Sequence, residues 1–168
     1  SLLVPRGIMG VLFPDFAFRL SMDASSAMTL LNRSLKYLFA LMFPVCAVFA
    51  LFAEELLRFW LGAEFAVASS LVVQILALGV LVNGVAQVPF GYLQSMGRAD
   101  LTAKLHLVEF PAYIVALIVL TERFGIAGTA MAWSARVIVD ALVLFAFVGR
   151  LVPGSKAGIV RLLAGLSG

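Results

Sequence analysis

The chain has 168 residues, of which 63% are hydrophobic and 12% charged, with a mean hydropathy of +1.10. Soluble domains average roughly 45–50% apolar and 25% charged residues, so this composition excludes an ordinary water-soluble fold. The net charge of +3 does not indicate a nucleic-acid partner, because the basic residues are not gathered on one soluble face. The single cysteine, Cys46, lies in an apolar run and can form no intrachain disulfide.

The two ends of the chain are too short to span a membrane by themselves. We interpret residues 1–18 as the truncated end of a preceding membrane helix, because their apolar stretch is brief and carries no signal-peptide features. Residues 151–168 are expected to be a cytoplasmic tail or the start of a further helix. Both expectations treat the sequence as a piece of a longer protein.

Between these ends, residues 19–150 predict one all-α, polytopic membrane helical bundle. Four apolar runs mark spans at about 35–53, 66–88, 101–121 and 126–148. A helix rises about 1.5 Å per residue, so about twenty residues cross a hydrocarbon layer of about 30 Å. Ser34 and Asp100 are expected to cap the first and third of these spans, because their side-chain oxygens can accept hydrogen bonds from free backbone amides.

The basic residues between the spans predict the orientation of the bundle. Eight of them fall in alternate connectors and flanks, and only Arg58 and Arg123 fall in the others. Because lysine and arginine are enriched in cytoplasmic connectors, this pattern places residues 19–34, 95–104 and 150–168 in the cytoplasm. Residues 54–60 carry two glutamates, then Phe59 and Trp60, which predicts a short helix on the outer surface.

The fourth predicted span contains two opposite charges, Arg136 and Asp140, four residues apart on one helical face. Either ion alone in hydrocarbon costs at least about 2.5–3.5 kcal/mol, so neither is expected to face lipid. One interpretation is a neutralised pair that locks this helix to its neighbours. The other is a hydrated cavity in which Arg136 receives an anionic group and Asp140 orients it.

The second predicted span carries a stripe of small and amide residues, namely Gly79, Asn83, Gln87, Gly91 and Gln94. Small residues allow helices to approach closely, and buried amides hydrogen-bond between helices, so the stripe can be a packing seam. Amides also donate and accept hydrogen bonds, which suits a wall that contacts sugar hydroxyls. On this second interpretation Asn83 and Gln87 bind substrate.

The third predicted span carries a comparable stripe of Thr102, His106, Glu109 and Tyr113. His106 is expected near the cytoplasmic headgroups. The interpretation without a specific function is that its imidazole simply extends to the membrane interface. Glu109 lies roughly 13 Å into the helix by helical rise, where it is expected to be protonated or paired with His106. Either arrangement suits a proton- or sodium-coupled carrier, with Glu109 and His106 as ion-coupling candidates.

No catalytic, cofactor or metal motif is present in the sequence. There is no His-x-x-x-His, no cysteine pair, no glycine-rich phosphate loop and no Gly-x-Ser-x-Gly turn. The sequence therefore predicts no enzyme, no cofactor and no metal site.

Four stretches, in their order around the spans, resemble a known family: FWLGAEF (59–65), QVPF (87–90), QSMGR (94–98) and FGIAGTA (124–130). They are similar to the C-terminal half of O-antigen-type lipid-linked oligosaccharide flippases, in the multidrug/oligosaccharidyl-lipid/polysaccharide exporter superfamily. The resemblance extends over about residues 13–148. The glycine–arginine turn and the later Phe-Gly-Ile-x-Gly stretch are its most specific parts.

The resemblance implies a two-lobed helical transporter with a central cavity, of which this chain would supply the last spans of the second lobe. Such proteins are multi-pass proteins of the cell inner membrane. They move an undecaprenyl-diphosphate-linked oligosaccharide to its outer leaflet by alternating access, in polysaccharide, O-antigen and lipopolysaccharide biosynthesis for the cell envelope. The implied partners are membrane lipid, the lipid-linked oligosaccharide, the missing N-terminal lobe and the polysaccharide polymerase machinery. Arg136 suits the diphosphate, since a guanidinium can bind phosphate oxygens through two hydrogen bonds.

Two alternatives remain open from the sequence. One keeps the superfamily and changes the cargo, to a multidrug and toxin extrusion antiporter or a lipid II flippase. Acidic cavity residues would favour cationic drugs, whereas an arginine within a membrane-spanning helix favours an anionic cargo. The other alternative is a membrane scaffold, or an inactive fragment, with no transport activity.

Overall fold

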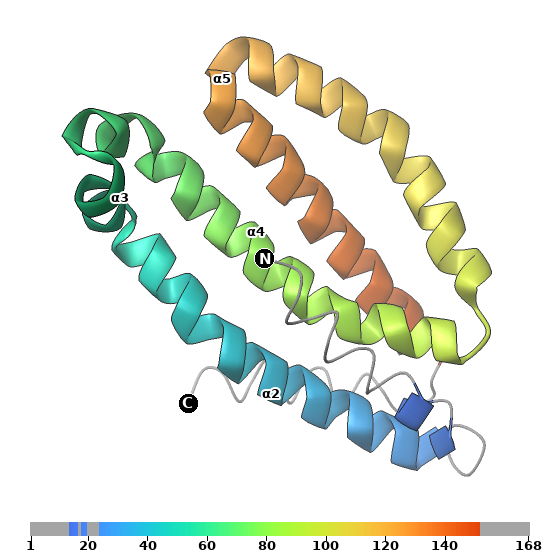
Figure 1. Ribbon diagram of the computed structural model, residues 1–168. Coiled ribbons are helices and arrows are strands. Elements are labelled where there is room, and N and C mark those ends of the chain that lie inside the picture. The colour runs from blue at the N-terminus through green and yellow to red at the C-terminus, as the bar shows by residue number, and fades with distance from the viewer. Residues whose placement is uncertain (1–13, 17, 20–23, 152–168) are drawn as a thin grey trace.

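The computed structural model describes residues 14–16, 18–19 and 24–151, and this part of the chain contains helices and no strand (Figure 1). The helices are α2 (Ala24–Leu51), α3 (Ala53–Leu61), α4 (Ala63–Ser95) and α5 (Ala99–Leu151). The all-α prediction is therefore confirmed. Most of the predicted truncated helix at residues 1–18, and the predicted tail after residue 151, lie outside the described residues.

Three of these helices are long and apolar enough to cross a membrane: Ser26–Leu51 of α2, and all of α4 and α5. Their outward faces expose large apolar side chains, such as Leu107 at 78% and Ile126 at 77%. Water would penalise so much exposed apolar surface, whereas lipid would not. The chain is a multi-pass membrane protein.

The long helix α5 folds back on itself at Gly125 (Figure 1). A straight helix of 53 residues would extend about 80 Å, far beyond the thickness of a bilayer. Gly125 has φ +58° and ψ −135°, a conformation that side chains with a Cβ rarely adopt. We call residues 99–124 the first arm and residues 126–151 the second arm. The predicted spans 101–121 and 126–148 fall one on each arm.

The second arm packs beside α4, and α2 packs on another side of α4 (Figure 1). Glycines allow these close approaches: a Cβ on Gly79 would lie 2.6 Å from the Ser134 hydroxyl of the second arm. A Cβ on Gly84 would overlap the sulfur of Met42 in α2. The small residues of α4 therefore set how near its neighbours lie.

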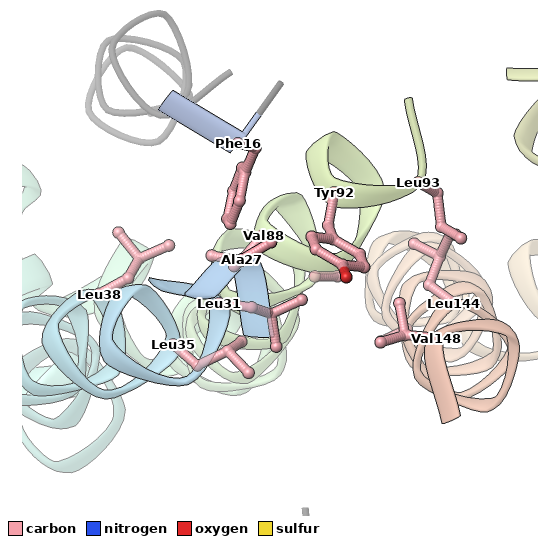
Figure 2. Packing of buried hydrophobic residues seen from close by; sticks show 12 residues of the cluster. Phe16, Ala27, Leu31, Leu35, Leu38, Val88, Tyr92, Leu93, Leu144 and Val148 are labelled. Carbon is pink, nitrogen blue, oxygen red and sulfur yellow. The ribbon is translucent and has the colours of Figure 1, made fainter. Parts of the chain in front are cut away.

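The apolar core lies where the start of α2, the end of α4 and the end of the second arm meet. Figure 2 shows Leu31 and Leu35 of α2 facing Val88 and Tyr92 of α4, with Leu144 and Val148 from the second arm. The ring of Phe16 packs edge-on against Tyr92, with ring centroids 5.5 Å apart. This cluster holds the three helices together at one end of the bundle.

The first predicted helix start is wrong. Ser34 does not cap a helix, because α2 already includes Ala24 and Ser34 lies buried in its interior. The reason is packing: Ala27 and Leu31 precede Ser34 and are fully buried in the core cluster, so burial extends the helix beyond the apolar run that predicted it.

The short helix predicted at residues 54–60 is confirmed as α3. In it Arg58 donates a 2.6 Å hydrogen bond to Glu54, and Phe59 is 95% exposed. The segment after α4 is a tight turn, in which Gly97 has φ +72° and Arg98 lies 3.3 Å from Asp100. The prediction that Asp100 caps the next helix is wrong, because α5 already begins at Ala99 and the Asp100 carboxylate is directed to Arg98.

Candidate functional site

A polar cavity of about 380 Å³ lies between α4 and the two arms of α5. Five of the six candidate residues predicted from the sequence line it: Asn83, Gln87, His106, Arg136 and Asp140. The rest of its lining is apolar, from Ala86, Phe90, Val137 and Leu144. The fold thus gathers polar side chains from three helical segments into one small space within an apolar bundle.

The amide stripe of α4 has two parts with different contacts. Asn83 and Gln87 line the polar cavity. Gly79, one turn before Asn83, instead lies against Trp133 and Ser134 of the second arm. The Ser134 hydroxyl donates a 3.1 Å hydrogen bond to the Ile75 carbonyl oxygen of α4. The stripe therefore combines a close-packed seam with a polar wall.

Arg136 of the second arm faces the first arm. Its Nε lies 3.9 Å from Oε2 of Glu109, and its guanidinium carbon lies 5.4 Å from the ring centroid of Tyr113. A guanidinium over an aromatic face is attracted by the ring quadrupole. The sequence predicted that Arg136 would pair with Asp140 on its own helix, but its carboxylate neighbour within 4 Å is Glu109, across the bend.

His106 of the first arm lies between two carboxylates. Its Nδ1 is 3.7 Å from Oε2 of Glu109 and 3.6 Å from Oδ1 of Asp140. The predicted contact between His106 and Glu109, three residues apart on one helix, is therefore present. All of these separations are longer than a hydrogen bond, so the groups attract one another electrostatically without direct hydrogen bonding.

Several polar atoms at this site are buried without a hydrogen-bond partner. They are both carboxylate oxygens of Glu109, Nδ1 of His106, Nε of Arg136 and Oδ1 of Asp140. Buried polar groups in folded proteins nearly always have partners, because desolvation is otherwise costly. An arrangement of this kind is suited to binding a polar or charged species.

A second cavity of about 520 Å³ lies between α2 and α4. It is larger than the polar cavity but is lined by apolar side chains, including Leu41, Cys46 and Ala77. Its lining includes no charged, amide or hydroxyl side chain that could bind an anion or a sugar. We therefore assign the candidate site to the smaller cavity.

Two features of the site were not recognised from the sequence. Tyr113 belonged to the polar stripe of the third predicted span but was given no role. An aromatic residue in such a stripe could have indicated a cation–π contact, which the structure shows with Arg136. The close grouping of His106, Glu109 and Asp140 had no sequence signal, because Asp140 comes from the other arm and its distance depends on the bend.

A comparison with known proteins finds a relative whose name agrees with the resemblance of the sequence motifs. The chain is 32% identical over 144 residues to a protein named "Putative O-antigen transporter" from Shigella flexneri. The alignment covers 84% of this chain but 34% of that protein, so the chain spans about one third of its relative's length. No protein-family model matches the chain, and no solved structure matches it significantly. The match confirms the resemblance found in the sequence.

Proposed function

Because the chain is related to the O-antigen-type flippases, we propose that it forms part of a transporter for an undecaprenyl-diphosphate-linked oligosaccharide. In this proposal it supplies the last spans of the second lobe, and the two arms of α5 cross the membrane separately, which makes four crossings. The cytoplasmic segments are residues 19–34, 95–104 and 150–168. The rest of the transporter completes the wall of the polar cavity.

The observation that supports this proposal is the polar cavity itself. Moving a diphosphate and sugars across hydrocarbon requires a compartment that replaces their hydration, since a bare charge in lipid is costly. Arg136 supplies the cationic group for the diphosphate. Asn83 and Gln87 supply amides that donate to and accept from sugar hydroxyls. Asp140 lines the same cavity but lies 3.6 Å from His106, so Glu109 takes the place beside Arg136 that was predicted for Asp140.

The size of the cavity limits what part of the substrate it holds. Ligand sites in proteins typically enclose roughly 300–1,000 Å³, so about 380 Å³ is near the lower end of that range. The proposed occupant is therefore the diphosphate with its first sugar. The isoprenoid chain remains in the bilayer, and the outer sugars extend into the space formed with the other lobe.

Glu109 and His106 are the ion-coupling residues in this proposal. Glu109 lies 3.9 Å from Arg136, so it competes with the diphosphate for the guanidinium. A cation that neutralises Glu109 weakens this attraction and makes Arg136 available to the anion. Coupled binding of this kind can bias an inward–outward equilibrium, because a ligand shifts states only through differential affinity.

The test is translocation of a lipid-linked oligosaccharide by the full-length transporter in proteoliposomes, with Arg136→Gln as the main variant. Loss of a charge-assisted hydrogen bond of about 1.5–3 kcal/mol should lower transport roughly 10- to 100-fold. Arg123→Gln is the matched control, because Arg123 is an exposed arginine beside the bend of α5 and should transport like the wild type. Full transport by Arg136→Gln, at equal protein in the membrane, would refute the assignment of the diphosphate to this cavity.

A further inference from the structure

The first arm and the second arm bring three potential metal ligands together. Nδ1 of His106, a carboxylate oxygen of Glu109 and a carboxylate oxygen of Asp140 all lie within 4.8 Å of one another. His106 and Glu109 are three residues apart on the first arm, and Asp140 comes from the second arm. From this geometry we infer that His106, Glu109 and Asp140 form a binding site for a divalent transition-metal cation such as Zn²⁺.

The spacing of the ligand atoms suits such an ion. Nδ1 of His106 lies 3.7 Å from the Glu109 oxygen and 3.6 Å from the Asp140 oxygen. Zinc binds nitrogen and oxygen ligands at about 2.0–2.2 Å, so ligands around one tetrahedral ion lie roughly 3.4 Å apart. Small side-chain rotations therefore place one cation between the three groups, with an open position toward the polar cavity.

A second observation points to a ligand independently of the clustering. The Glu109 side chain is only 8% exposed, and neither of its oxygens has a hydrogen-bond partner. An ionised carboxylate so deeply buried needs compensation, and its nearest charged neighbour, Arg136, is 3.9 Å away. A metal ion bound directly to the carboxylate would supply that compensation.

The charges of the site also favour a cation. With a neutral imidazole, Glu109, Asp140 and Arg136 together carry one net negative charge. A divalent ion reverses the sign, which leaves the site attractive to an anion in the adjoining cavity. His106 and Asp140 line that cavity directly, so an ion bound there has a path of entry.

The identity of the ligands selects the class of metal. Sodium, magnesium and calcium prefer oxygen atoms, whereas an imidazole nitrogen beside two carboxylates suits zinc and its first-row neighbours. The inference depends on the ligand geometry and on no assumption about the transported cargo. It can therefore hold or fail separately from the proposed flippase activity.

The test measures metal binding by the purified full-length transporter in detergent, after removal of bound metal with a chelator. We expect one Zn²⁺ per chain by isothermal titration calorimetry, and visible absorption bands from Co²⁺ in the same site. His106→Ala, Glu109→Gln and Asp140→Asn should each weaken binding by at least about tenfold, as changes even behind the ligands do in known sites. Glu122→Gln is the control, because Glu122 is an exposed carboxylate at the bend and should change nothing.

An additional variant distinguishes a specific metal site from nonspecific attraction of cations to carboxylates. Arg136→Gln removes a positive charge beside the ligand Glu109 and should tighten Zn²⁺ binding several-fold, opposite in sign to the ligand variants. Glu109→Gln keeps the side-chain shape, and helical content by circular dichroism checks that each variant is folded. The inference is overturned if Zn²⁺ does not saturate at one equivalent, if all three folded ligand variants bind like the wild type, or if excess Na⁺ displaces the ion.

Discussion

The two cavities beside α4 differ in polarity more than in size. The larger, about 520 Å³, is lined by apolar residues of α2 and α4, whereas the smaller, about 380 Å³, holds five polar side chains. Val80 lines the first cavity and Asn83 lines the second, although they are only three positions apart in α4. The two cavities therefore differ in the chemistry of their lining, and this difference makes the smaller one the candidate binding site.

The charged groups of the polar cavity are partly balanced across the bend of α5. Glu109 of the first arm faces Arg136 of the second, and His106 of the first arm faces Asp140 of the second. Each of these groups alone would be expensive within hydrocarbon. The apolar cavity has no such compensation, so it should tolerate a new charge much less well.

The largest expected effect comes from placing the same charge in each cavity. Val80→Asp introduces an uncompensated carboxylate in the apolar cavity and should destabilise the protein by about 2.5–3.5 kcal/mol. Asn83→Asp places it one turn away, where Arg136 lines the same cavity, and should cost much less. The measurement is the free energy of unfolding in mixed micelles. Equal destabilisation by both variants would contradict the distinction between the two cavities.

A smaller effect is expected from separating the two arms that build the polar cavity. A Cβ on Gly128 would overlap the backbone carbonyl of Leu120, which cannot move as a flexible side chain can. Gly128→Val should therefore destabilise the protein by about 1–3 kcal/mol, as overpacking typically does.

The same variant gives a second measurement on the site. Because the two arms supply different ligands, Gly128→Val should also weaken Zn²⁺ binding while leaving the apolar cavity between α2 and α4 unchanged. Gly97→Ala is a useful comparison, since open space surrounds Gly97 and only its positive φ is strained. Unaltered stability and metal binding in Gly128→Val would show that the arms do not depend on this close approach.

The smallest effect concerns the seam that holds the second arm to α4. Ser134→Ala removes the 3.1 Å hydrogen bond to the Ile75 carbonyl. It introduces no larger side chain beside Gly79, so no new steric clash is expected. Hydrogen bonds between membrane helices average about 0.6 kcal/mol, so we expect a loss of that order in unfolding free energy. A loss several times larger would mean that the hydroxyl also positions the polar cavity.

Much of the helical architecture was predictable from apolar run length. The runs near 66–88, 101–121 and 126–148 fall within α4 and the two arms of α5, and the acidic-aromatic segment is α3. The start of the first helix was not predictable in this way. Burial of Ala27 and Leu31 against α4 extends α2 upstream of its most apolar stretch, and burial is a property of the fold.

The candidate residues could be identified one by one because each is a polar group in an apolar run. Placing such a group in hydrocarbon costs free energy, so its presence indicates a structural or functional role. The sequence could show that Arg136 and Asp140 share one helical face, and that His106 and Glu109 share another. It could not show which carboxylate Arg136 faces. That depends on how the second arm rotates against the first, which Gly125 and the contacts of Gly128 determine.

The amino-acid sequence by itself determined that lipid surrounds this chain, that it is helical, and which polar side chains are exceptional. These properties follow from hydropathy and helical periodicity, which are local. The tertiary structure decided that five of those side chains line one cavity, that Glu109 contacts Arg136, and that His106 lies between two carboxylates. Such pairings join residues on different helical segments, and only the bend and the packing of the segments set their distances.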